Sequence, residues 1–213
     1  MAAIAILGAN GRTGRILVRQ GLIRGHRVTA VTRGSNDLRS GDLPAHSAGL
    51  STVVGDVTDP RSLTEVLHGH DAVISALGTT GRGPTTLYSA SAAALVAALA
   101  PDTRLLVISS AGIEVPATAG AGTRLAGRLL HRIMRGTYDD MARMEAELAA
   151  SELIWTAIRP SRLTDGPATG TPRICLDASD PVGSRTRRAD LADYLLNALD
   201  DPHTHRRPVA ISS

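Results

Sequence analysis

The sequence predicts an α/β protein with a doubly wound parallel sheet and a small, irregular C-terminal portion. From the N-terminus to Pro160, short continuous apolar runs alternate with helical patterns, which is typical of βαβ units. These runs lack the in–out alternation of half-exposed strands, so we expect strands that are buried on both faces. Because the 213 residues contain no linker rich in Gly, Pro or Ser, we expect one domain over residues 1–213.

The expected elements begin with an apolar strand over Ala3–Leu7 that ends at Gly8. A helical pattern follows over 13–23 and stops at Gly25. Asp59 and Pro60 are an N-cap and a first-turn proline, and they predict a helix to residue 67. We expect further strands over 27–32, 52–54, 72–77, 104–108 and 154–158, and further helices over 86–99 and 138–150. In the C-terminal portion we expect a strand over 173–176, a helix over 189–199 and a strand over 208–211.

A glycine-rich loop joins the first strand to the first helix. Gly8, Gly11 and Gly14 have the spacing G-x-x-G-x-x-G, and they follow a strand and open a helix, as this motif requires. The first glycine allows a tight turn, the second a close approach to a pyrophosphate, and the third close packing of helix on strand. The motif predicts a Rossmann-type dinucleotide site, whose cofactor residues here are Gly8, Asn10, Gly11, Arg12, Thr13 and Gly14.

The end of the second strand indicates which dinucleotide binds. An NAD site offers a carboxylate to the adenosine ribose, whereas an NADP site offers cations to the 2′-phosphate. Arg33 lies where the carboxylate would be, with Arg12 and Ser35 nearby, so we expect NADP(H). Asp37 keeps NAD as the alternative.

Other strands of such a sheet also end at the cofactor side, because ligands bind at the carboxyl ends of the strands. Ordinary loop structure is the alternative at each of these positions. The further cofactor residues predicted in this way are Asp56, Val57, Ala76, Leu77, Gly78 and Ser109, and Ser110 is expected beside the nicotinamide.

These motifs together resemble a known family. They are Gly8–Gly14, Gly55–Val57, Asp71–Gly78, Pro84–Thr86, Ser109–Ala111 and Arg159–Ser161. The chain is similar to the NAD(P)H-binding, NmrA-like group of atypical short-chain dehydrogenases/reductases, which contains biliverdin-IXβ reductase, also called flavin reductase.

The resemblance implies a shallow pocket over the nicotinamide, in which NADPH delivers hydride to a flavin, a linear tetrapyrrole or a similar planar acceptor. It implies a catalytic position for Ser110 and adds Pro160 to the cofactor residues. This sequence departs from the reductase at two places, so the identity of the acceptor is the property that the resemblance predicts least. Ser161 stands where the reductase has histidine, and the segment 112–137, which would border the substrate pocket, is longer here.

The composition constrains the chemistry. All 23 basic residues are arginine, so the Tyr-x-x-x-Lys pair of the common short-chain dehydrogenases cannot form. Tyr138 is followed four residues later by Ala142, and Arg143 cannot replace the lysine because it stays charged. We therefore expect an acceptor whose reduced form takes its proton from solvent. Tyr138, which would line the pocket, is the second candidate catalytic residue after Ser110, with a helix-start residue packed on the surface as the alternative.

Several other features have a plain structural interpretation. A basic amphipathic stripe of Arg124, Arg128, Arg132 and Arg135 is a solvated face, or alternatively attracts an acidic substrate. The pairs His68/His70 and His203/His205 are surface histidines, and we expect no metal site. Arg185–Arg188 is interpreted as a solvated turn.

The remaining expectations concern partners and alternatives. A net charge of +3, four aromatic residues, one cysteine and no long apolar stretch predict a cytoplasmic protein without nucleic-acid or membrane partners. We expect a small-molecule acceptor and a monomer or small homo-oligomer. A non-catalytic NADP(H) sensor is the alternative function, and a nucleotide-sugar epimerase or dehydratase is disfavoured by the missing Tyr–Lys pair.

Overall fold

The central sheet of the protein has the predicted doubly wound order. A computed structural model describes residues 1–34, 48–79, 81, 83–114, 120, 122, 127, 130–180 and 182–213. Eight strands lie in the order β3-β2-β1-β4-β5-β6-β10-β8, in which the neighbours are parallel except for the antiparallel pair β10–β8. These strands are β1 (Ala3–Leu7), β2 (Arg27–Thr32), β3 (Leu50–Val54), β4 (Ala72–Ser75), β5 (Arg104–Ile108), β6 (Ile154–Pro160), β8 (Arg173–Leu176) and β10 (Arg207–Ser212).

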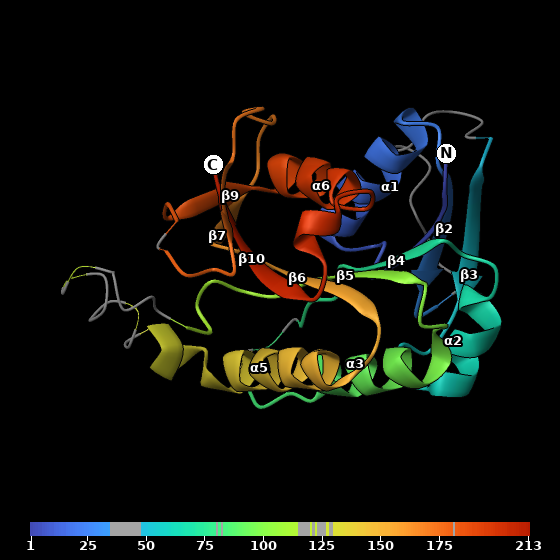
Figure 1. Ribbon diagram of the computed structural model, residues 1–213, viewed down its shortest axis with the longest axis horizontal. Helices are drawn as coiled ribbons and strands as arrows, with labels where there is room; N and C mark the ends of the chain where they lie inside the picture. The colour runs from blue at the N-terminus through green and yellow to red at the C-terminus, as the bar shows by residue number, and fades with distance from the viewer. Residues whose placement is uncertain are drawn as a thin grey trace.

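Helices cover both faces of the sheet (Figure 1). On one face α1 packs against α6, and on the other α3 packs against both α2 and α5. Both layers arise from amphipathic or alanine-rich segments that follow a strand in sequence, as a right-handed crossover requires. The helices are α1 (Arg12–Ile23), α2 (Pro60–Leu67), α3 (Leu87–Ala98), α5 (Arg135–Ala150) and α6 (Arg188–Asn197).

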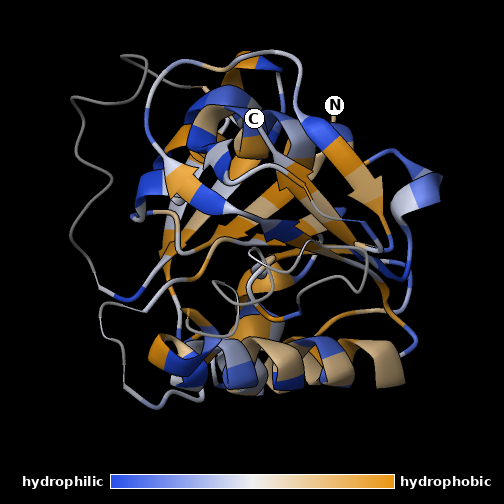
Figure 2. Ribbon diagram, turned by 90° about the vertical axis from the view of Figure 1, so that its left-hand side faces the viewer, coloured by the Kyte–Doolittle hydropathy of each residue, from blue (hydrophilic) through white to orange (hydrophobic). Residues whose placement is uncertain are grey.

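Each helical layer encloses its own core. Ile4 and Ile6 of β1 face α1 and α6, whereas Ala5 and Leu7 face α2, α3 and α5, and all four are fully buried. A strand that packs on both faces buries its side chains at nearly every position, which is why β1 is a continuous apolar run. Figure 2 shows the same pattern, with hydrophobic strands between helices of mixed hydropathy.

Local signals set several boundaries as expected. Gly25 has φ +79° and ends α1, and the side chain of Asp59 accepts a hydrogen bond from the Arg61 amide at the start of α2. Helix α5 begins at Arg135, three residues before the predicted start. None of the helices in the described part of the chain is long and apolar enough to span a membrane.

The C-terminal portion contains two strands that the sequence analysis missed. The strands β7 (Arg162–Thr164) and β9 (Arg185–Arg187) pair in parallel as a separate two-stranded sheet. The interpretation of Arg185–Arg188 as a solvated turn is wrong, because three of its residues form β9 and Arg188 begins α6. The pair places the loop after β7 beside the N-terminus of α6.

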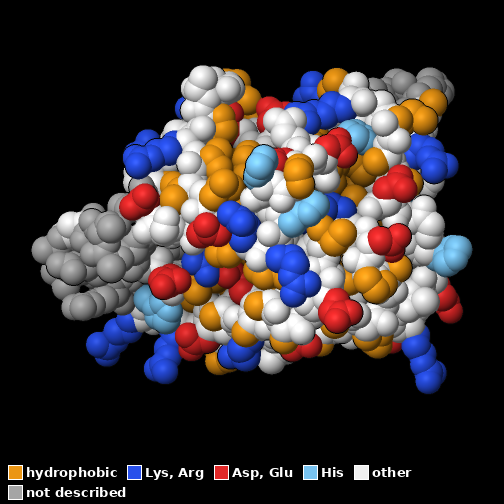
Figure 3. Space-filling model, in the orientation of Figure 1, with side chains coloured by type: hydrophobic (Ala, Val, Ile, Leu, Met, Phe, Trp, Pro, Cys, Tyr) orange, Lys and Arg blue, Asp and Glu red, His pale blue; other side chains and the backbone are white. Residues whose placement is uncertain are grey.

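Acidic and basic side chains are interspersed on the face shown in Figure 3. They do not gather there into one continuous basic strip of the kind that tracks a nucleic-acid backbone. Arg124 and Arg128, half of the predicted basic stripe, lie outside the described residues, as do Ser35 and Asp37. Arg135 is exposed and its Nε lies 3.3 Å from Oδ2 of Asp139 one turn later.

Candidate active site

A cleft of about 760 Å³ opens at the carboxyl ends of the strands. This volume is in the range of known small-molecule sites, and the position is where doubly wound sheets bind ligands. Of the cofactor residues predicted from the sequence, the cleft is lined by Gly8, Asn10, Gly11, Arg12, Thr13, Arg33, Val57, Ala76, Leu77 and Gly78. The other lining residues were not predicted at the cofactor site; they are Val31, Thr32, Gly34, Thr79, Leu87, Ile108, Leu163 and Arg188.

The glycine loop is tightly fitted to the strand beside it. Gly8 has φ +74°, and a Cβ at this position would lie 2.7 Å from the carbonyl oxygen of Ala76. A Cβ at Gly14 would meet the backbone of Gly8 and Ala9, so the start of α1 lies directly against the turn. Gly14 therefore supports the loop from behind and does not line the cleft.

The loop leaves polar groups available to a ligand. Asn10 Oδ1 is buried without a hydrogen-bond partner in the described structure, and Asn10 lines the cleft. The first-turn amides of α1 lack intrahelical acceptors, and the helix dipole adds positive potential there. A Cβ at Gly11 would lie 3.2 Å from the Gly8 carbonyl oxygen, so a side chain here would crowd the turn. The free amides and the close approach of the backbone fit the diphosphate of a dinucleotide. The unpaired Asn10 Oδ1 fits a ribose hydroxyl.

Charge along the cleft is one-sided. Arg12, Arg33 and Arg188 line it, and no carboxylate is among its described lining residues. Asp56 itself is exposed and outside the cleft, while the next residue, Val57, lines it. Hydrogen bonds from the Thr58 hydroxyl and amide, at 2.7 and 2.8 Å, lower the pKa of Asp56 and hold the turn after β3.

Ser109 and Ser110, at the end of β5, are engaged within the protein. The Ser109 hydroxyl is buried and donates to Glu145 Oε1 at 2.5 Å, and the Ser110 hydroxyl accepts from the Gly112 amide at 3.1 Å. Ser110 is half-buried, and neither serine lines the cleft. The cleft wall at this strand is made by Ile108.

Tyr138 and Pro160 do not line the cleft. Tyr138 is buried in the core on the α5 side, against Gly112 and within 5.6 Å of the His131 ring, measured between ring centroids. Tyr138 therefore neither lines the cleft nor lies at the surface, where the alternative interpretation places it. The carbonyl of Pro160 accepts from the Ala111 amide at 3.0 Å and so fixes the segment after Ser110.

A buried carboxylate positions the β4–α3 side of the cleft. Asp140 of α5 is fully buried and accepts from the Tyr88 amide at 2.9 Å and from the Ser89 hydroxyl at 2.5 Å, at the N-terminus of α3. The hydroxyl of Tyr88 in turn accepts from the Thr79 amide at 3.3 Å, and Thr79 lines the cleft. Arg143, one turn later on α5, also lies 3.0 Å from Asp140 Oδ1, but the partners on α3 are about fifty residues away in sequence, so no local motif marks this role of Asp140.

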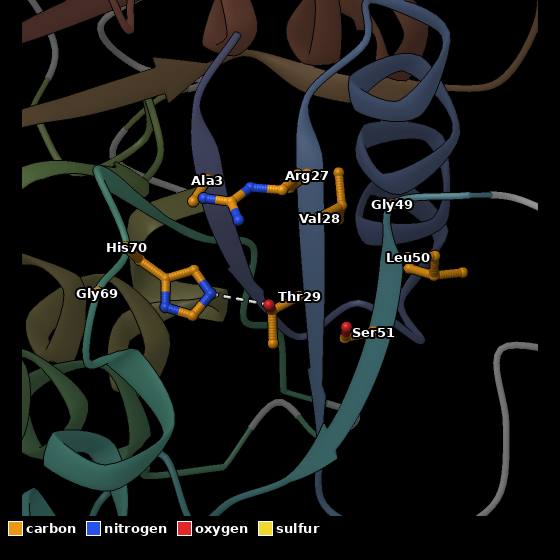
Figure 4. Close-up of a pocket in the computed structure, with 9 residues that line it drawn as sticks. All are labelled: Ala3, Arg27, Val28, Thr29, Gly49, Leu50, Ser51, Gly69 and His70. Carbon is orange, nitrogen blue, oxygen red and sulfur yellow. Dashed lines mark hydrogen bonds between the residues drawn. The ribbon is translucent and has the colours of Figure 1, made fainter.

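A second, smaller hollow of about 280 Å³ lies at the amino ends of the strands, opposite the cleft (Figure 4). Its lining includes the first residues of β1, β2 and β3. His70 Nε2 lies 2.7 Å from the Thr29 hydroxyl and its Nδ1 lies 3.1 Å from the Leu67 carbonyl, so both ring nitrogens serve to tie β2 to the turn before β4. The other side chains drawn in Figure 4 do not converge on this bond, and those of Val28 and Leu50 lie away from it.

Comparison with known proteins agrees with this geometry. The chain matches the NAD(P)H-binding family over residues 8–202, and it belongs to that family. It is similar to the oxidoreductase stcQ of Emericella nidulans, with 30% identity over 230 residues that cover 99% of this chain and 82% of that protein. The family membership confirms the resemblance inferred from the motifs and assigns a nicotinamide cofactor, without distinguishing NAD from NADP.

Solved structures share the fold over the whole chain. The oxidoreductase ylbE from Lactococcus lactis has a TM-score of 0.79 and 23% identity, covering 99% of this chain and 90% of that one. A candidate NADH-flavin reductase from Streptococcus pneumoniae has a TM-score of 0.76 and 23% identity, covering both chains fully. ChuY, an anaerobilin reductase from Escherichia coli O157:H7, has a TM-score of 0.73 and 19% identity, covering 99% and 96%.

Proposed function

We propose that this protein is an NADPH-dependent reductase that acts on a planar acceptor such as a flavin or a linear tetrapyrrole. The observation that carries the proposal is the cleft at the strand ends, with its glycine loop, orphaned Asn10 Oδ1 and three arginines. The solved relatives that are named for flavin and tetrapyrrole reduction support the acceptor class. When bound, the dinucleotide supplies the hydride.

The residues of this chain bind and orient the two substrates. The Gly8–Gly14 turn and the first turn of α1 would hold the diphosphate, and Asn10 Oδ1 would accept a hydrogen bond from a ribose hydroxyl. Leu77, Leu87 and Ile108 give the cleft an apolar wall against which a flat ring system can stack and exclude water. Ser110 remains the candidate polar residue near the reacting ring, and a rotation of its hydroxyl away from the Gly112 amide would free it.

The chemistry does not require a tuned acid from this chain. With no lysine in the sequence and Tyr138 packed in the core, the Tyr–Lys relay of carbonyl reduction has no equivalent among the described residues. A reduced flavin or tetrapyrrole can take its proton from water at the cleft mouth. Catalysis then rests on proximity and orientation.

The test is oxidation of NADPH, followed by its absorbance, with a panel of flavins, quinones and biliverdin. We expect turnover with at least one flavin or tetrapyrrole. Tight NADP(H) binding with no turnover across the panel would contradict the reductase proposal and favour the sensor.

Arg33 is expected to select NADPH over NADH. Replacing Arg33 by Gln removes a charge-assisted contact to the 2′-phosphate, so the Kd for NADPH should rise about 10- to 100-fold, while that for NADH changes little. Titration by nicotinamide fluorescence measures both constants. Arg173→Gln, on the exposed edge strand β8, is the control and should change neither. Equal weakening of both dinucleotides by Arg33→Gln would contradict NADP selectivity.

A further inference from the structure

Two arginines of the cleft share one carboxylate. Arg12, at the start of α1, and Arg188, at the start of α6, both line the cleft. Both are ion-paired with Asp165, which follows β7; Arg188 Nη1 lies 2.8 Å from Asp165 Oδ1, and Arg12 Nη2 contacts Oδ2. Two segments that are far apart in sequence thus bring their guanidinium groups to one point of the cleft mouth.

The carboxylate is fixed in place by its surroundings. Arg187 Nη1 donates to the Asp165 carbonyl at 2.6 Å. Further along the same loop, the buried carboxylate of Asp190 accepts from the Thr169 amide at 2.8 Å and from the Gly170 amide at 3.1 Å. The loop is therefore bound to α6 at both ends, and Arg188, whose side chain is 12% exposed, is held in one orientation.

The charges at this point do not balance. Asp165 provides one negative charge to two guanidinium groups, and the described lining of the cleft contains no carboxylate. Burial, and then the like charge of Arg12, lower the pKa of Arg188. An added oxyanion would relieve this repulsion, and arginine forks bind carboxylate and phosphate oxygens in a bidentate way.

The position of Arg188 in the cleft differs from that of Arg33. Arg33 follows β2, on the side where a dinucleotide places its adenosine. Arg188 begins α6, and it lines the same cleft as Leu163 of β7. An apolar side chain and a fixed cation in one cleft suit a flat ring that carries an acidic group.

We propose that Arg12 and Arg188, held by Asp165, bind a phosphate or carboxylate group of the acceptor, so that the reductase selects anionic acceptors over neutral ones. This inference rests on the proposed function and names the substrate class of the same site. The diphosphate of the cofactor is an alternative source of the same chemistry, and the experiment separates the two.

The experiment measures binding to the NADP⁺-loaded protein, without turnover. Flavin fluorescence gives Kd for FMN and for riboflavin, which differ by one phosphate, and absorbance titration gives Kd for biliverdin and for its dimethyl ester, which lacks the free carboxylates. We expect tighter binding of the anion in at least one pair. Arg188→Gln should weaken the preferred anion about 10- to 100-fold and leave its neutral partner and NADP⁺ within about twofold.

Two further variants complete the design. Arg188→Lys keeps a charge beside Asp165 but loses the fork, so it should retain the fold and show an intermediate loss of anion affinity. Arg162→Gln changes an exposed arginine on β7 that does not line the cleft and should have no effect on any ligand.

The opposing outcomes are distinct. Equal affinity for both members of each pair, or no binding of any of the four acceptors, would overturn the inference. If Arg188→Gln weakens NADP⁺ as much as the anionic acceptor, the arginine pair holds the cofactor and the inference also fails. Turnover with no anion preference would leave the proposed function intact. Anion preference lost in Arg188→Gln without turnover in the wild type would support the subsite and contradict the reductase.

Discussion

Gly8→Ala is expected to lower the free energy of unfolding by about 2–5 kcal/mol, because the new methyl group meets two costs at once. The backbone at Gly8 has φ +74°, which an L-residue adopts only with strain. The Cβ would also lie 2.7 Å from the carbonyl oxygen of Ala76, a backbone atom that cannot move without displacing the end of β4. Since Gly8 and Ala76 both line the cleft, the affinity for NADPH should fall with stability.

Gly25→Ala separates the two costs. Gly25 has φ +79°, close to that of Gly8, and an added Cβ there would have no heavy atom within 4 Å. This variant should lose only the left-handed backbone cost, about 1–2 kcal/mol, and bind NADPH normally. Urea unfolding and fluorescence titration of both variants give the comparison. Equal losses at the two positions would show that the close approach of the loop to β4 contributes nothing.

The sheet could be predicted from the sequence because its signals are local. β1, β2 and β5 have the predicted bounds, since strands buried on both faces are mostly apolar runs that are recognisable in the sequence. The glycine loop could be found for a similar reason: the backbone conformation and close approach that it needs are available only to glycine. Gly8 and Gly14 meet these needs by contacts within the loop and with β4.

The C-terminal side of the cleft could not be predicted in this way. β7 and β9 are three residues long and begin with exposed arginines, so they show neither an apolar run nor a clear alternation. Arg188 has the same local context as a solvated arginine. Its place in the cleft depends on Asp165, which the chain brings to it only through the pairing of β7 with β9.

Buried charges are the other feature that local patterns miss. Arg104, at the start of β5, is 6% exposed and donates to Thr156 and Thr204 hydroxyls and to the Ile154 carbonyl. Burial lowers its pKa to about 10. Sequence patterns place charged residues at the surface, and only partners distant in sequence make burial tolerable.

Glu145→Ala is expected to have the largest effect on stability, about 3–5 kcal/mol, because it leaves Arg159 charged and nearly buried. Arg159 Nη2 lies 2.6 Å from Glu145 Oε2, and the two side chains are 12% and 10% exposed. Burial of Arg159 disfavours its charge, but hydrogen bonds and the charge of Glu145, with a smaller contribution from Glu114, outweigh this and raise its pKa. Among the described residues, Glu114, whose side chain is 74% exposed, is then the one carboxylate left paired with Arg159, at 3.4 Å.

A double-mutant cycle tests whether the loss of stability in Glu145→Ala comes from the unpaired charge of Arg159. Arg159→Ala combined with Glu145→Ala should cost less than the sum of the single changes, because no unpaired charge is left between α5 and β6. Asp139→Ala, which breaks the exposed pair with Arg135 on the same helix, is the control and should cost about 0.3–0.5 kcal/mol. Additive single losses, or a Glu145→Ala loss no larger than that of the control, would contradict the assignment. The Ser109 hydroxyl also loses its acceptor in Glu145→Ala, so the end of β5 next to Ile108 should loosen and NADPH affinity should fall in this variant but not in Asp139→Ala.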